Sequence, residues 1–203
     1  MAAGSEELGA NVELGGCGVV KKLWIVAIAA ACLAVITVLF PYSFLSAYTA
    51  VSFSSDLPSL QKYKMEVAAL REENVSRETE DRVQYTTDFI LDMYEMDVAA
   101  ANRVKVGKGD LDEMLTDVQR LRDRLLEFAF EEKLNYEANK YLYAALRSCL
   151  SAEDEILWIK SHSYYSRFIL IEHLKELQSD LRKSFEMYAN FYDGHYHYVD
   201  EVE

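Results

Sequence analysis

The chain has 203 residues, and its 34 acidic side chains outnumber its 21 lysines and arginines, which gives a formal charge of −13. A surface with this excess of carboxylates repels phosphate groups, so the composition excludes a nucleic-acid-binding protein. Only two prolines and eight glycines interrupt the chain. Because both residue types disfavour helix interiors, their scarcity predicts an all-α fold.

A long apolar stretch near the N-terminus predicts a membrane-spanning helix. The residues from Leu23 to Phe40 carry no charged side chain, and their number is close to the ~20 that an α-helix needs to cross a bilayer. Aromatic rings stand at both ends, where they favour the headgroup region, and a proline ends or kinks a helix. The predicted anchor spans residues 21–41, and its anchoring residues are Lys21, Lys22, Trp24, Phe40, Pro41 and the adjoining Tyr42.

The two lysines also predict the orientation of this helix. Basic residues favour the cytoplasmic side of a membrane, so residues 1–20 form a short cytoplasmic tail and the chain after the helix is extracytoplasmic. Lipidation at Cys32 and signal-peptidase cleavage near Ala47 or Ala50 are the alternatives to an uncleaved signal anchor. The apolar run continues beyond Cys32, and neither alanine has a small residue two positions before it, so the sequence favours a retained anchor.

Residues 42–56 form a connector for which the sequence leaves two readings open. Hydroxyl side chains recur at every third position from Ser43 to Ser52, with apolar residues between them. This spacing is compatible with a short helix that lies in the membrane interface. Continuation of the membrane helix into the next domain is equally compatible with it.

Start and stop signals predict three long helices after the connector. Asp110 and Ser151 each precede an acidic residue by three positions, which is the pattern of a helix N-terminus. Gly107 and Gly109 mark a break, and Gly194 is expected to end the last helix. The predicted helices cover 57–106, with an interruption possible near 74–76, then 110–150 and 152–193. They form an elongated bundle over 57–193 of antiparallel helices, followed by a polar tail at 194–203.

Apolar residues recur every three or four positions in the last two of these helices, as in coiled-coil packing. Glu132 and Asn135 interrupt the stripe of the second helix. We interpret them either as a stutter in the packing or as polar groups retained for specificity. Both are therefore candidate interaction residues.

Aromatic residues are dense on both sides of the turn predicted at Ser151. Such side chains supply contact area at low entropic cost, although packing in the core is the more ordinary role. The aromatic candidates for an interaction surface are Tyr141, Trp158, Tyr164 and Tyr165.

Histidines near the C-terminus raise the question of a metal site. Asp193, His195 and His197 offer imidazole and carboxylate donors within a short span, but they are weak candidates because a polar C-terminus is often frayed. His162 and His173 would lie about 16 Å apart along one helix, too far to share an ion. No metal site and no cofactor are therefore predicted.

The remaining signals concern modification. Cys17 beside the membrane suits palmitoylation, and Asn74 lies in a glycosylation sequon if the protein is eukaryotic. Cys149 stands alone in the exterior domain, where a buried thiol is the expected role and a bond between chains the alternative.

The short motifs of nucleotide-binding proteins, serine hydrolases and zinc peptidases are missing from the sequence. We therefore predict that the protein is not an enzyme. The favoured function is that of a single-pass membrane-anchored structural or interaction protein, an accessory or scaffold subunit of a membrane complex. It contacts the bilayer through its anchor and binds a protein partner, or a second copy, through its exterior helical rod. The alternative is an extracytoplasmic sensory or ligand-binding bundle that signals through a membrane partner.

Overall fold

The computed structural model describes residues 16–43, 50–77, 82–131, 134–162 and 164–202, with side chains at 16–20, 131 and 197–202 left undescribed. This part of the chain is mostly helical, which confirms the all-α prediction in outline, but it holds more and shorter helices than the three-helix bundle predicted after the connector. Its elements are α1 (Gly16–Leu39), β1 (Ala50–Ser54), α2 (Leu57–Ser76), α3 (Arg82–Tyr94), α4 (Asp97–Ala100), β2 (Arg103–Gly107), α5 (Asp110–Glu131), α6 (Tyr136–Ser161) and α7 (Arg167–Val202).

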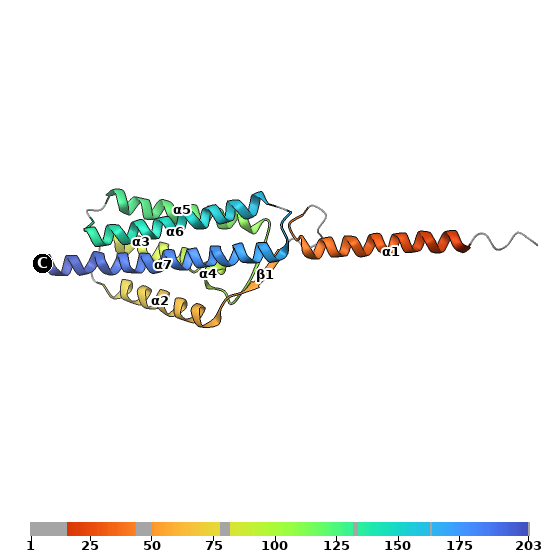
Figure 1. Cartoon of the computed structure of the whole chain (residues 1–203). Coiled ribbons are helices and arrows are strands. Elements are labelled where there is room, and N and C mark those ends of the chain that lie inside the picture. The colour runs from red at the N-terminus through yellow and green to blue at the C-terminus, as the bar shows by residue number, and fades with distance from the viewer. Residues whose placement is uncertain (1–15, 44–49, 78–81, 132–133, 163, 203) are drawn as a thin grey trace, which may run out of the picture.

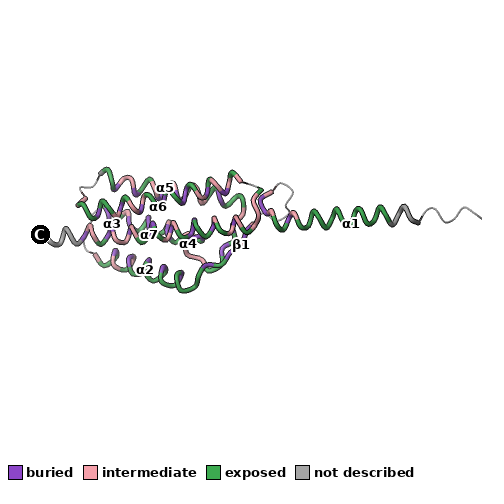
Figure 2. The backbone as a smooth tube through the Cα atoms, viewed as in Figure 1, coloured by how far each residue is buried: buried purple, intermediate pink, exposed green. Residues whose placement is uncertain are grey.

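Helix α1 projects from one end of the bundle, and the C-terminus lies at the opposite end (Figure 1). Its segment from Lys21 to Leu39 is long and apolar enough to cross a membrane. Nearly all of that segment is exposed (Figure 2), with the buried Thr37 near its C-terminal end as an exception. The helix ends just before Pro41, as predicted, since proline removes the backbone donor that would continue it.

The connector contains a strand where a helix was expected. Strand β1 pairs antiparallel with β2, in a register that aligns Ala50 with Gly107 and Ser54 with Arg103. Burial alternates along both strands, with Val51 and Phe53 turned inward on β1. This period of two overrides the three-residue spacing of hydroxyls, so both helical readings are wrong for residues 50–54.

The first predicted helix, 57–106, is divided in the structure. Asp56 caps α2 by accepting a hydrogen bond from the Ser59 backbone N–H, and α2 ends at Ser76, where an interruption was anticipated. After α3 and the single turn α4, the chain becomes strand β2. The alternating apolar side chains of Val104 and Val106 explain this change from helix to strand.

The boundary between the next two helices lies at Asn135 and not at Ser151. The Asn135 side chain accepts a hydrogen bond from the Ala138 backbone N–H at 2.7 Å, so it is the N-cap of α6. Ser151 lies in the interior of α6, because Cys149, Ala152 and Ile156 continue one buried face through it. The capping pattern at Ser151 was therefore misleading, and the supposed stutter at Asn135 is a helix start.

Helix α7 runs through Gly194 to Val202, so the predicted helix end at Gly194 is wrong, and the polar tail continues the helix as far as Val202. At this point α7 lies close to the start of α6. The Gly194 carbonyl accepts a hydrogen bond from the Asn135 side-chain amide at 2.9 Å, and a Cβ on Gly194 would lie 3.7 Å from the Ala138 backbone nitrogen. The glycine thus marks a close approach of two helices.

The core is centred on α7. Buried hydroxyl groups from α7 and the helices around it are linked by hydrogen bonds. Ser184 donates to the Ala145 carbonyl of α6, which leaves its oxygen to accept the Tyr94 hydroxyl of α3 at 2.8 Å. The Tyr63 hydroxyl of α2 donates in turn to the Tyr94 carbonyl. Buried hydroxyls with partners fix one arrangement of the helices, because an unpaired one is costly. These buried hydrogen bonds therefore specify how α2, α3, α6 and α7 pack together.

Candidate functional site

The face of α6 that points away from the core carries a row of exposed apolar side chains. Tyr136 is 81% exposed, Tyr143 68%, Leu150 44% and Leu157 47%. They recur every seven residues, which is the repeat of a coiled-coil position. A globular protein scatters single exposed apolar residues without consequence, but a regular row along one helix favours contact with another helix.

Charged and polar side chains recur with the same seven-residue spacing, four positions after each apolar side chain of the row. Lys140, Arg147, Asp154 and Ser161 each lie four residues after an apolar member of the row, and all four are exposed. The eight residues together form a seam about 38 Å long at 1.5 Å per residue. We call this seam the α6 outer stripe; it comprises Tyr136, Lys140, Tyr143, Arg147, Leu150, Asp154, Leu157 and Ser161.

A second group of functional interest lies where α6 meets the start of α7. The indole ring of Trp158 stacks on Tyr165 with a centroid distance of 4.7 Å, and His162 and His173 pack against it at 4.5 and 3.6 Å. Because α6 ends at Ser161 and the chain reverses, the two histidines contact one ring. The expected 16 Å separation along a single helix is therefore wrong.

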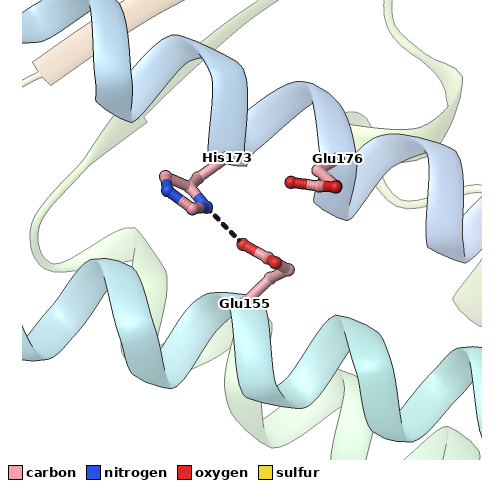
Figure 3. Close-up of side chains that lie close together, drawn as sticks. All are labelled: Glu155, His173 and Glu176. Atoms are coloured by element: carbon pink, nitrogen blue, oxygen red, sulfur yellow. Dashed lines mark hydrogen bonds and ion pairs between the residues drawn. The ribbon is translucent and has the colours of Figure 1, made fainter.

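Two carboxylates adjoin His173 on the side shown in Figure 3. The Nδ1 atom of His173 lies 2.7 Å from a carboxylate oxygen of Glu155 on α6. Glu176 is three residues after His173 on α7, which places both on one face of that helix. One ligand atom from each of the three residues lies within 4.8 Å of the others. We call this group the Glu155–His173–Glu176 cluster.

The interaction residues predicted from the sequence are dispersed in the structure. Tyr141 is half-buried against the core, Tyr164 is 70% exposed beyond the end of α6, and Trp158 and Tyr165 belong to one stack. Asn135 is a helix cap, whereas Glu132 lies outside the described residues. Among the described candidates, the structure brings Trp158 and Tyr165 together, but the turn expected at Ser151 to gather the whole group lies inside α6.

The predicted anchor residues lie along α1 and just beyond it. Lys21, Lys22 and Trp24 are exposed, with Trp24 66% exposed, and Phe40 is half-buried. Pro41 and Tyr42 are buried, and the Tyr42 hydroxyl donates to the Val106 carbonyl at 2.9 Å. Tyr42 thus ties the end of the apolar helix to the strand pair.

The C-terminal metal candidates lie in or near the last described turn of α7. Asp193 is exposed and the His195 ring packs against Phe191 and Tyr196. His197 belongs to the stretch whose side chains are not described. Among the described side chains, Asp193 and His195 do not join a group of three metal-binding donors.

A buried ion pair joins α5 to α6. Arg122 donates to one oxygen of Glu153 at 2.8 Å, while the other oxygen is buried without a hydrogen-bond partner among the described residues. Burial raises the pKa of Glu153 above its ordinary value of 4.5, and the Arg122 charge only partly offsets this. The folded protein therefore holds the Glu153 proton more tightly than the unfolded chain does.

This linkage gives a pH-dependent expectation for Glu153→Gln. With a raised folded-state pKa, the contribution of Glu153 to stability is present in full below the unfolded pKa and is lost as pH rises through the folded pKa. Glutamine does not titrate, so the variant has no such loss of stability as the pH rises. We expect the unfolding free energy of the variant relative to the wild type to increase from pH 4 to pH 7, measured by urea denaturation in detergent. A difference that is constant with pH would contradict the assignment.

An open groove between α2 and α7 is the remaining feature of note. It encloses about 550 Å³, and charged side chains of both signs, among them Lys62, Glu66 and Arg182, line it. Arg182 is held in place by donating to the Ala99 carbonyl.

Comparison with protein-family models, curated proteins and solved structures found no match for the chain.

Proposed function

We propose that the protein is a single-pass membrane-anchored interaction protein, an accessory or scaffold subunit of a membrane complex. Helix α1 crosses the bilayer with its N-terminus in the cytoplasm, and the bundle of α2 to α7 stands outside. The α6 outer stripe binds a helix of a different protein held in the same membrane. The seven-residue spacing of exposed Tyr136, Tyr143, Leu150 and Leu157 is the observation that carries the proposal.

The proposed membrane anchor is supported by the difference in burial of apolar side chains between α1 and the bundle. The bundle buries a large set of apolar side chains in its core, but α1 leaves Trp24 and Ile25 each 66% exposed. Exposed apolar area costs about 25 cal/mol per Å² in water, so a helix of this kind needs an apolar surrounding. Lys21 and Lys22 flank its N-terminal side and favour that side as cytoplasmic.

The charges of the stripe decide between a second copy and a different partner. Two copies anchored in one membrane pair in parallel, which brings each stripe residue opposite its own counterpart. Lys140 would then face Lys140, Arg147 would face Arg147, and Asp154 would face Asp154. Like charges at such layers oppose pairing, so the stripe disfavours self-association.

A partner helix with the complementary pattern offers a favourable contact to every apolar and charged residue of the stripe. It carries apolar residues opposite the four apolar positions, acidic residues opposite Lys140 and Arg147, and a basic residue opposite Asp154. The seven-residue repeat drifts by about 20° per heptad on a straight helix, so the two helices cross at a shallow left-handed angle. The sensory or ligand-binding alternative needs an enclosed pocket, whereas the groove of about 550 Å³ between α2 and α7 is open.

The test compares Leu150→Glu with Met65→Glu. Both residues are exposed, Leu150 on α6 and Met65 at 66% on α2, so neither change disturbs the core. Full-length tagged proteins are purified from native membranes in mild detergent, and the attached proteins are identified by mass spectrometry. We expect one stoichiometric partner with the wild type and with Met65→Glu, and its loss by at least about tenfold with Leu150→Glu.

Two results would contradict the proposal. A partner that stays bound to Leu150→Glu places the contact elsewhere than the α6 outer stripe. A wild-type protein that purifies without any attached protein contradicts the proposed complex. Extraction with alkaline carbonate tests the anchor separately, because a membrane-spanning protein stays in the pellet, whereas a chain without a spanning helix is released.

A further inference from the structure

The Glu155–His173–Glu176 cluster joins two helices through side chains with metal-binding atoms. Glu155 comes from α6, and His173 and Glu176 come from one face of α7 (Figure 3). The imidazole nitrogen and one oxygen of each carboxylate lie within 4.8 Å of one another. Around a tetrahedral ion with bonds near 2.1 Å, neighbouring ligand atoms lie about 3.4 Å apart. Small side-chain rotations therefore bring the three atoms into a coordination sphere.

The charge balance of the cluster favours a cation. Glu155 pairs with His173 at 2.7 Å. Glu176 makes no hydrogen bond or ion pair with any other described residue, although its carboxylate lies beside that of Glu155. Two carboxylates at this separation repel each other. A divalent ion between them removes that repulsion and satisfies the unpaired Glu176.

The orientation of His173 is set by the neighbouring aromatic ring. Its imidazole packs on Trp158 with a centroid distance of 3.6 Å, which directs Nδ1 toward Glu155. A ligand held in place by packing has less rotational freedom to lose on binding a metal. The half-buried positions of His173 and Glu155 also limit competition from water, while the exposed Glu176 leaves room for water ligands.

We propose that this cluster binds a divalent first-row transition-metal ion, with zinc as the representative species. One imidazole nitrogen and two carboxylate oxygens suit such an ion better than calcium or magnesium, which prefer oxygen ligands alone. Water completes the coordination sphere. The ion cross-links α6 to α7 beside the turn that connects them, on the flank of α6 that faces α7.

The binding test uses Trp158 as a local reporter. The chain has two tryptophans, so Trp24→Phe leaves Trp158 as the single indole, and it touches His173. Co²⁺ is titrated into this full-length protein in detergent, with a tag that contains no histidine. We expect saturable quenching of Trp158 fluorescence at one equivalent, a visible Co²⁺ absorption band, and displacement of Co²⁺ by Zn²⁺.

Paired variants assign the site to its ligands. Glu176→Gln is expected to weaken Co²⁺ binding by about tenfold or more, whereas Glu172→Gln removes the same charge one turn away and leaves binding unchanged. His173→Ala is expected to abolish it, and His162→Ala, at the other histidine of the Trp158 stack, to preserve it. Binding that survives both Glu176→Gln and His173→Ala would overturn the proposal. So would binding that is lost in a His195→Ala/His197→Ala variant, or no saturation at millimolar Co²⁺.

Discussion

Phe185→Ala is expected to lower the free energy of unfolding by about 3–5 kcal/mol, the usual cost of removing a buried aromatic ring. Phe185 is 1% exposed at the centre of the bundle. Its ring meets Tyr63 of α2 edge-on at 5.2 Å and Tyr94 of α3 at 5.5 Å. Three helices therefore lose a shared contact in this variant, and the hydrogen-bonded hydroxyls of both tyrosines resist collapse into the cavity.

Urea denaturation in detergent, followed by tryptophan fluorescence and near-ultraviolet circular dichroism, measures this loss. Phe168→Ala is the matched control, because it makes the same change on the same helix at a side chain that is 72% exposed. We expect a change within about 0.5 kcal/mol for the control. Equal effects of the two variants would mean that the core is not centred on Phe185.

Lys140→Leu/Arg147→Leu is expected to turn the protein into a homodimer. The wild-type stripe places like charges opposite each other at Lys140, Arg147 and Asp154 in a parallel pair, and leucine at the first two positions replaces two of these three repulsive contacts with apolar ones. Anchoring in a shared membrane raises the effective concentration of the two stripes further. Cross-linking in proteoliposomes and sedimentation velocity in detergent detect the dimer.

A charge-reversed variant supplies the control. Lys140→Glu/Arg147→Glu keeps like charges opposite each other and is expected to stay monomeric alone. Mixed with the wild type, it offers glutamates to Lys140 and Arg147, so we expect a mixed dimer to form. A leucine variant that stays monomeric, or a mixture that does not associate, would show that these two positions do not control pairing.

The features that local chemistry dictates were predictable from the sequence. The apolar helix α1 follows from an uncharged run ended by Pro41, and the starts of α2 and α5 follow from Asp56 and Asp110. Asp110 accepts a hydrogen bond from the Gly107 backbone N–H at 2.7 Å, which closes the turn that the glycines predict. Each of these signals acts within a few residues, so no tertiary contact is needed to read it.

The predicted helix boundaries and connector were wrong where tertiary packing, and not the local sequence, determines the structure. Ser151 has the pattern of a helix start but lies on the exposed side of a helix that core contacts keep continuous. Gly194 resembles a helix end but lies inside α7, where the buried residues Phe191, Tyr192 and Tyr196 pack in the core on both sides of it. The strand pair required residues 50–54 to meet residues 103–107, a contact between distant segments that their short alternating patterns did not reveal.

The candidate surface was missed for the same reason. The repeat of Tyr136, Tyr143, Leu150 and Leu157 is visible in the sequence, but a boundary placed at Ser151 cuts it into two unrelated halves. The Glu155–His173–Glu176 cluster depends on the turn after Ser161, which brings α7 back along α6. Correct helix boundaries would have revealed the first feature, whereas the second requires the packing of the two helices.

In the proposed membrane arrangement, the hydrogen bond from the Tyr42 hydroxyl to the Val106 carbonyl would couple the tilt of α1 to the bundle. A membrane helix longer than the local hydrocarbon layer tilts to fit it, typically by about 20°. In that arrangement, a bundle that moves rigidly with α1 would follow the tilt as a lever arm. Helix α6 is about 39 Å long at 1.5 Å per residue, so a 20° tilt carries its far end sideways by roughly 13 Å. Membranes of different thickness would thus present Tyr136 to neighbouring proteins at different lateral reach.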